Sequence, residues 1–231
     1  MPGAYRFAVT WGTGTRLSGC TQPRPARKAM THRRLETAED VCAFVAEQTD
    51  MMRLLQSVSA LGLPDCWIGA GFIRNAVWDA LHGRMPNCAL LNDIDVVFFD
   101  RANASPAADA AIENRLAASA PNLPWSVKNQ ARMHLRNGEE TYYDTAAAIA
   151  RWPETATAVA VRLRHGRLEL LAPHGLEDLI GLIVRPTPAF AQRSHAFACR
   201  LRAKNWLARW PRLRIVGPRT GRSRDQDPDR D

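Results

Sequence analysis

The stretch that decides the fold is residues 66–100, CWIGAGFIRNAVWDALHGRMPNCALLNDIDVVFFD. Near its end, Asp93 and Asp95 are two residues apart, so in a strand their side chains lie on the same face. The apolar run at residues 96–99 predicts that this strand is buried. Two carboxylates this close repel each other unless a cation or a shared proton compensates. The pattern therefore favours a divalent cation at the end of a core strand.

The small-residue turn before this strand supplies groups for binding phosphate. Gly69 and Gly71 allow the backbone to approach an anion closely, and a helix that begins near Phe72 directs its free amides toward that anion. Arg74 can add a bidentate contact to phosphate oxygens. Magnesium suits such a site, because it commonly takes one or two protein carboxylates together with water and substrate phosphates. The alternative is that the acids belong to a turn and a strand end, and that the glycines only interrupt a loop.

Two short blocks in this stretch resemble a known superfamily. Residues 69–75 (GAGFIRN) and 93–96 (DIDV) resemble the glycine motif and Asp-x-Asp of the DNA polymerase β-like nucleotidyltransferases, in the variant of CCA-adding enzymes. Together with residues 125–134 (WSVKNQARMH) and 152–159 (WPETATAV), they resemble a family of bacterial nucleotidyltransferase-like proteins without a settled substrate. This resemblance covers roughly residues 35–216.

The resemblance implies an α/β (α+β) fold with a polymerase β-like nucleotidyltransferase core, a small mixed sheet covered by helices. It implies transfer of a nucleoside monophosphate from an NTP to a hydroxyl acceptor. Asp93 and Asp95 would be the catalytic residues and the ligands of Mg²⁺ or Mn²⁺. Gly69, Gly71 and Arg74 would bind the phosphates, with Asn75 fixing the turn or contacting the ribose.

Further polar side chains follow in the third block. Lys128, Asn129 and Arg132 are all hydrogen-bond donors and are expected to bind phosphate or base; a solvated helix start is the alternative. His134 has no His or Cys partner at metal-ligand spacing, so we expect a packed or edge histidine. Residues 152–157 offer a glutamate and two threonines that either contact a ribose or cap a helix.

The sequence departs from the superfamily at the third carboxylate, which often lies on the strand after the Asp-x-Asp strand. Here that strand offers Ser126, Lys128 and Asn129 but no acid, which weakens two-metal chemistry. Glu169 is the candidate substitute, because a hairpin at residues 158–171 would return it to the sheet face. The alternative is a solvent-facing glutamate.

Hydrophobic periodicity and breaker residues predict the remaining elements. We expect helices over residues 36–61 with a break near 49–50, 107–120, 176–184 and 189–210, and strands over 125–127, 158–163, 167–171 and 210–216. In residues 189–210, cations are spread around the helix, and some of them are expected to line the acceptor side of a cleft and attract phosphates. These cations are Arg193, Arg200, Arg202, Lys204 and Arg209.

Charge is unevenly distributed along the 231 residues. The net charge is +8, yet residues 1–34 and 193–216 each hold seven Lys/Arg and no acid, and the tail 217–231 is balanced. Subtraction leaves −6 for residues 35–192, so the presumed catalytic body is acidic. Residues 1–34 have the composition of a disordered basic extension, and 217–231 of a disordered tail, which leaves a nucleotidyltransferase-like domain at 35–216. Either the extension recruits a polyanion, or the natural start is Met30.

Other classes of protein are disfavoured. No stretch has the roughly 20 apolar residues of a membrane span, and the amino terminus lacks the apolar region of a signal peptide. The five cysteines lack a Cys-x-x-Cys pair, so we expect reduced thiols in a cytoplasmic protein. Two alternatives to an enzyme stay open, a non-catalytic nucleotide-binding regulator and an RNA-binding protein that uses the basic termini. The acceptor (small molecule, protein or RNA), the base and the oligomeric state are undetermined.

Overall fold

The computed structural model describes residues 5–9 and 35–218, with only the backbone described for 5–9. The predicted tail beyond 218 and most of the predicted extension lie outside these residues. The helices are α1 (Ala38–Ala46), α2 (Thr49–Ser59), α3 (Gly71–Leu81), α4 (Pro106–Ser119), α5 (Met133–Asn137), α6 (Thr145–Ile149), α7 (Glu177–Ile180), α8 (Pro188–Ala191), α9 (Ser194–Lys204) and α10 (Trp206–Arg209). Short 3₁₀ turns cover Cys88–Leu90 and Gln130–Arg132.

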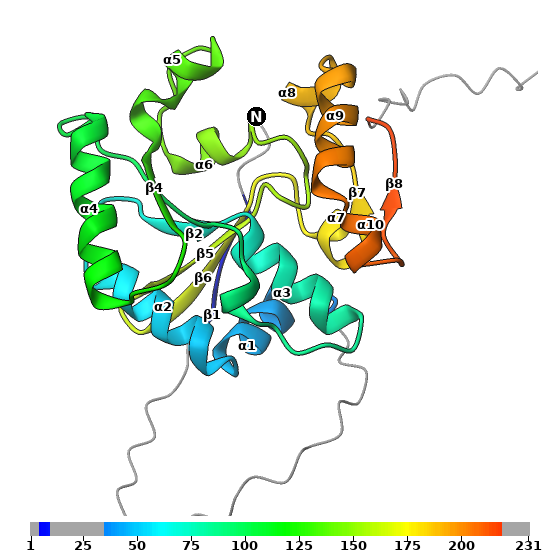
Figure 1. Cartoon of the computed structure of the whole chain (residues 1–231), viewed down its shortest axis with the longest axis horizontal. Coiled ribbons are helices and arrows are strands. Elements are labelled where there is room, and N and C mark those ends of the chain that lie inside the picture. Colours follow the sequence, from blue (N-terminus) through cyan, green and yellow to red (C-terminus); the bar gives the residue numbers. More distant parts are fainter. Residues whose placement is uncertain (1–4, 10–34, 219–231) are drawn as a thin grey trace, which may run out of the picture.

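A mixed sheet forms the centre of the molecule (Figure 1). Its strand order is β1-β6-β5-β2-β3-β4; only the β3–β4 pair is parallel. The strands of this sheet are β1 (Tyr5–Val9), β2 (Trp67–Gly69), β3 (Ile94–Phe98), β4 (Trp125–Asn129), β5 (Ala160–Arg164) and β6 (Arg167–Ala172). A small mixed sheet covered by helices is therefore confirmed.

The two faces of the sheet have different functions. One face packs the main core: Ile68, Val96 and Val161 are fully buried there, under α1, α2 and α3. The opposite face carries Asp95, because strand partners share a face and Asp95 pairs with Gly69. A smaller apolar cluster with α6 covers part of that face. Figure 1 shows α1–α3 on one side of the sheet and α5 and α6 on the other.

The amino-terminal helices agree with the sequence. Thr37 and Asp40 form a capping box at the start of α1, which satisfies two backbone amides, and the break near 49–50 separates α1 from α2.

β1 differs from the predicted disordered extension. Residues 5–9 pair antiparallel with β6, Tyr5 opposite Ala172 and Val9 opposite Leu168. In the sequence of these residues, YRFAV, aromatic or β-branched residues alternate with others, which is a strand pattern. The prediction of disorder was based on the Gly, Pro and Arg content of the first thirty residues and missed this short pattern.

The two carboxy-terminal helices that the sequence predicted are divided. Residues 176–184 form only α7, followed by β7 (Ile183–Val184), which pairs in parallel with β8 (Arg214–Ile215). Leu182 between them has φ 56°, which ends the helix. Residues 189–210 form three short helices instead of one, and Asn205, with φ 44°, separates α9 from α10. The predicted strand at 210–216 is limited to β8.

A module comprising α7 to α10, β7 and β8 packs against α3. Trp78 of α3 makes edge contacts with the rings of Trp206 and Trp210, at centroid distances of 5.6 and 5.2 Å. Asp79 accepts hydrogen bonds from Trp210 Nε1 and Arg209 Nη2, both at 2.8 Å. This docking places α9 beside the carboxyl-bearing face of the sheet (Figure 1).

Candidate active site

The site begins where β2 turns into α3. The helix starts at Gly71, and its N-cap Ala70 has φ 52° and ψ −120°. A non-glycine residue with a positive φ has a strained backbone, and such strain is concentrated at functional sites. The Arg74 amide is bonded to the Ala70 carbonyl, whereas the earlier amides of α3 precede the first intrahelical bond. The turn therefore presents free amides and the positive end of a helix dipole.

Gly71 lies at the point where three polar side chains meet. A Cβ atom there would be 3.6 Å from Arg74 Nη2, 3.7 Å from Asn75 Nδ2 and 3.9 Å from Asp93 Oδ1. The glycine thus leaves space between the turn and these groups, and the structure brings together the glycine, arginine, asparagine and aspartate that the sequence singled out.

Gly69 has a different environment. A Cβ atom there would be 2.6 Å from Trp152 Cη2 and 3.3 Å from the Val159 carbonyl oxygen, so the indole fills the space that the glycine leaves. The structure gives Gly69 a packing role, with no phosphate contact required to explain it.

Gly69→Ala is therefore expected to lower the free energy of unfolding by about 1–3 kcal/mol, because the added methyl overpacks the indole. Thermal unfolding would measure this. Trp152→Leu in the same chain should recover part of the loss; an alanine variant as stable as wild type would contradict the packing role.

Asp93 and Asp95 lie at the start of β3. Asp93 is exposed just before the strand, and Asp95, inside it, is partly buried. Burial, and next the charge of Asp93, raises the pKa of Asp95 to about 6, against the lowering effect of Arg74, Lys204 and a hydrogen bond from Ser126. The negative charge of Asp93 thus acts on Asp95, although burial has the larger effect on its pKa.

This donor set fits a hard divalent cation. Magnesium needs only one or two protein carboxylates when water and phosphate complete its octahedron, and a cation would relieve the repulsion between Asp93 and Asp95. Within the described part of the chain, no group of three or more Asp, Glu, His or Cys side chains is placed to hold a metal. A site with these two acids is what the residues support.

Arg74 is buried behind the turn. It donates to Thr157 Oγ1 at 2.8 Å and to Asn75 Oδ1 at 2.8 and 3.2 Å. Its guanidinium also lies 4.5 Å from the ring centre of Trp206. Burial lowers its pKa to about 10, so it is charged at neutral pH. Residues Asn75 and Thr157 therefore orient a fixed positive charge close to Asp93 and Asp95.

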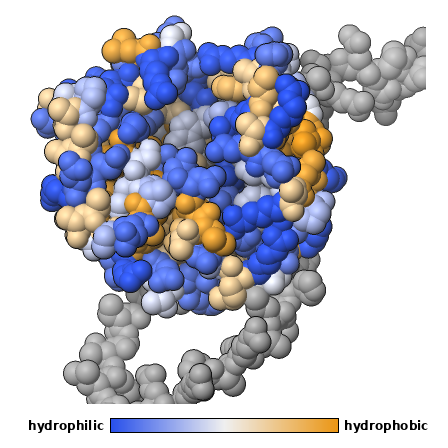
Figure 2. Space-filling view, in the orientation of Figure 1, coloured by the Kyte–Doolittle hydropathy of each residue, from blue (hydrophilic) through white to orange (hydrophobic). Residues whose placement is uncertain are grey.

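A groove opens in front of these groups. Its volume is about 360 Å³, and Ala70, Asp95 and Thr157 belong to its walls. Its cationic lining residues are Lys128, Arg136, Arg151, Arg193 and Arg200. Figure 2 shows that the surface of this side of the molecule is largely hydrophilic. The groove combines one acidic end with a cationic wall, which suits a bound polyanion.

Lys128 is the one member of the predicted trio Lys128, Asn129 and Arg132 that lines the groove. Asn129 is fully buried, and its amide donates to the Asp100 and Asn103 carbonyls. Arg132 is held by Asp109 of α4. In β4, side chains alternate between faces, so Asn129 lies opposite to Lys128. The structure therefore does not bring Asn129 and Arg132 to the site.

Glu169 does not complete the carboxylate pair. It lies on β6, which β5 and β2 separate from β3, a span of roughly 14 Å at the usual strand spacing. Its Oε2 accepts from Arg162 Nε at 2.7 Å. Hairpin geometry returned this glutamate to the same face as Asp95, but the strand order keeps the two apart.

The turn at residues 152–157 connects the sheet to the carboxy-terminal module, and its Thr157 accepts a hydrogen bond from Arg74 in the candidate site. Thr155 donates to Asp178 at 2.7 Å, and Glu154, fully buried, pairs with Arg200 of α9. Arg200 is 46 residues from Glu154, so no local pattern could have revealed the pair. Arg193, also in the groove, lies 3.7 Å from Glu139. Asp178 and Glu139 were not singled out from the sequence.

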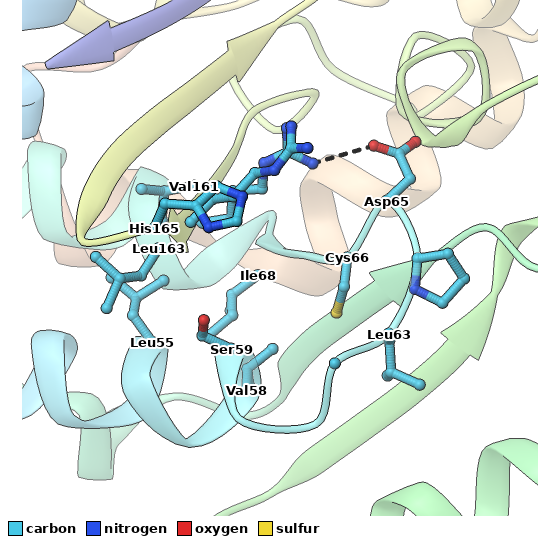
Figure 3. Close-up of a pocket in the computed structure, with 14 residues that line it drawn as sticks. Leu55, Val58, Ser59, Leu63, Asp65, Cys66, Ile68, Val161, Leu163 and His165 are labelled. Atoms are coloured by element: carbon cyan, nitrogen blue, oxygen red, sulfur yellow. Dashed lines mark hydrogen bonds and ion pairs between the residues drawn. The ribbon is translucent and has the colours of Figure 1, made fainter.

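A second, larger cavity of about 630 Å³ lies elsewhere (Figure 3). Figure 3 shows Leu55 and Val58 of α2 on one side and His165 of the β5–β6 turn on the other, with Asp65 at the rim. None of the carboxylates of β3 reaches it. We place the candidate site at the smaller groove, because that one contains Asp95.

The fold and this arrangement define a polymerase β-like nucleotidyltransferase domain of the CCA-adding enzyme head type. Residues 56–215 match the model of the family described as Nucleotidyltransferase. The chain belongs to this family.

The solved structures to which this chain is similar include CCA-adding enzymes. One, described as revealing a CCA-adding enzyme head domain, is 33% identical with a TM-score of 0.72; the match covers 81% of this chain and 100% of that chain. A CCA-adding enzyme in complex with CTP is 16% identical, with a TM-score of 0.48, over 78% of this chain and 43% of its own. The Thermotoga maritima CCA-adding enzyme complexed with tRNA is 16% identical, with a TM-score of 0.49, over 78% and 42%. The chain thus matches less than half the length of these two enzymes.

A search of curated proteins finds no match. Among the described helices, none is long and apolar enough to cross a membrane.

Proposed function

We propose that this protein transfers a nucleoside monophosphate from an NTP to a hydroxyl acceptor, with Mg²⁺ or Mn²⁺. The observation that carries the proposal is the position of Asp93 and Asp95 next to the amino terminus of α3 and the buried Arg74. Family membership supports nucleotidyl transfer. The NTP as donor is inferred from this family membership together with the phosphate-binding groups beside Asp93 and Asp95.

Each group has a role in this reaction. Asp93 and Asp95 would hold the metal, which, when bound, offsets charge that builds on the phosphoryl and leaving oxygens. The first amides of α3 would bind phosphate oxygens, and Arg74 would stabilise the negative charge of the triphosphate from behind the turn. Ser126 keeps Asp95 oriented through its hydrogen bond. Lys128 would contact phosphate at the groove wall.

The test is the shift in melting temperature with each NTP, with and without Mg²⁺ or Mn²⁺. We expect a metal-dependent rise in wild type, because a ligand that binds the folded state stabilises it, and its loss in Asp93→Asn. Asp50→Asn, an exposed acid of α2, is the control and should keep the rise. A wild-type rise that persists in Asp93→Asn would contradict the assignment of this residue as a metal ligand.

A non-catalytic nucleotide-binding protein is the second candidate, and one observation favours it. The strand on which the superfamily often has a third acid is β4 here, and it offers Ser126 opposite Asp95 and no carboxylate. The same shift assay followed by product analysis separates the two. Metal-dependent NTP binding without pyrophosphate release, across a screen of small-molecule, protein and RNA acceptors, would support the regulator.

We do not propose RNA binding through the basic carboxy-terminal segment. Three of its arginines, Arg193, Arg200 and Arg209, lie within ion-pair distance of Glu139, Glu154 and Asp79. Arg209 is held at the interface with α3, and Arg193 and Arg200 line the groove, so these three arginines do not indicate an RNA-binding face outside the groove.

A further inference from the structure

Behind one wall of the groove, a buried carboxylate pairs with the guanidinium group of a lining residue. Glu154 is fully buried, and its two oxygens accept from Arg200 Nε at 2.5 Å and from Arg200 Nη2 at 3.2 Å. Arg200 comes from α9, and its side chain is 29% exposed, on the groove side. The carboxylate therefore fixes one edge of this guanidinium and leaves other N–H groups available.

A second guanidinium belongs to Arg74, and both lie against the same indole. The distances to the ring centre of Trp206 are 4.5 Å for Arg74 Cζ and 5.8 Å for Arg200 Cζ. Among the described residues, Arg74 forms hydrogen bonds but no ion pair within 4.0 Å. Glu154 thus balances one of two neighbouring positive charges.

The excess of positive charge at Arg74 and Arg200 increases when Asp93 and Asp95 bind a cation. Asp93 and Asp95 are the other acids whose charge favours protonated Arg74. If they bind a cation, their charge no longer offsets the guanidinium, and an uncompensated buried charge is costly. A polyphosphate that spans the metal and the arginines would supply the missing negative charge.

We propose that Arg200, positioned by Glu154, binds a phosphate of the nucleotide's polyphosphate chain, so that α9 completes the phosphate site. This rests on the proposed function for the identity of the ligand. The guanidinium is suited to it, because two N–H groups can contact two phosphate oxygens at once. The module docked on α3 then contributes a phosphate-binding residue to the site, in addition to the residues of the sheet and of α3.

The experiment measures binding of inorganic tripolyphosphate by calorimetry in the presence of Mg²⁺. Removing only Arg200 would leave Glu154 buried and unpaired, so the test uses the double variant Glu154→Gln with Arg200→Gln, which removes both charges. Glu154→Gln alone removes the carboxylate and keeps the cation. The matched control is Arg162→Gln with Glu169→Gln, a part-buried Arg–Glu pair of β5 and β6 whose Nε–Oε2 distance is 2.7 Å, outside the groove.

We expect the Glu154/Arg200 double variant to bind tripolyphosphate about 10- to 100-fold more weakly, the value of one or two charge-assisted hydrogen bonds. Glu154→Gln should bind at least as tightly as wild type, and the Arg162/Glu169 control should be unchanged. If the folded Glu154/Arg200 variant bound tripolyphosphate like wild type, Arg200 would have a structural role only, and the proposal would be overturned.

Failure of the role proposed for Arg200 can be distinguished from failure of the proposed nucleotidyl transfer. Arg200-dependent binding of tripolyphosphate without nucleotide transfer would keep the phosphate site and remove the enzymatic assignment. Transfer that is unchanged in the Glu154/Arg200 variant, in KM for NTP as well as kcat, would keep the enzyme and remove the role of Arg200.

Discussion

Asp95→Asn is expected to make the metal-free protein more stable at pH 7.5 and to reduce nucleotidyl transfer at least about 100-fold. The second effect follows because the amide is a poor ligand for the metal that would stabilise charge in the reaction. The first follows because burial and Asp93 raise the pKa of Asp95 to about 6, so ionising this group opposes folding. Stability and activity thus change in opposite directions at one residue.

The size of the stability gain in Asp95→Asn depends on pH. Below pH 4 the carboxyl is protonated in both the folded and unfolded protein, so Asp95→Asn changes little. Between about pH 4 and 6 the folded state binds more protons, so the free energy of unfolding of wild type falls as pH rises. Above about pH 6 the loss is complete, about 3 kcal/mol for a pKa raised from 3.8 to about 6. The difference in the free energy of unfolding between Asp95→Asn and wild type should therefore grow between about pH 4 and 6.

Urea unfolding in EDTA at pH 4.5 and 7.5 measures this difference. Asp100→Asn, just beyond the other end of β3, is the control: hydrogen bonds from Asn103 and the Ala102 amide lower the pKa of Asp100, so its replacement should not stabilise the protein at pH 7.5. An Asp95→Asn variant less stable than wild type at pH 7.5 would show that the carboxylate is better compensated than its surroundings indicate.

Asp79→Ala is expected to cause the largest loss of stability, about 2–4 kcal/mol. Asp79 is 3% exposed and accepts from Trp210 Nε1 and Arg209 Nη2. Its removal leaves a buried indole N–H without its acceptor and breaks a part-buried ion pair. Because these bonds connect α3 to the carboxy-terminal module, the variant should also weaken binding in the groove through α9.

Thermal unfolding compares this variant with Asp50→Ala. Asp50 lies 3.5 Å from Arg53, but both side chains are at least 70% exposed, so that variant should change stability by less than about 1 kcal/mol. Asp79→Asn should fall between the two, since its amide oxygen can still accept from Trp210. A melting temperature for Asp79→Ala equal to that of Asp50→Ala would exclude Asp79 as the anchor of the module.

The sequence by itself determined the features that depend on neighbours in the chain. The Asp-x-Asp spacing placed Asp93 and Asp95 together at the start of β3, and the small residues before α3 marked the turn. The capping residues Thr37 and Asp40 marked the start of α1. Each of these follows from backbone geometry within a few residues, and the order of the blocks was enough to indicate the nucleotidyltransferase superfamily.

Only the tertiary structure decided which distant side chains share the site. Strand order separates Glu169 from Asp95, and the pairing of β4 with β3 places Lys128, instead of Asn129, on the face that carries Asp95. Helix α9 brings Arg200 to Glu154, and β8 pairs with residues 183–184, for which the sequence predicted a helix. These outcomes depend on contacts between residues about thirty or more positions apart, whose energies no local periodicity records.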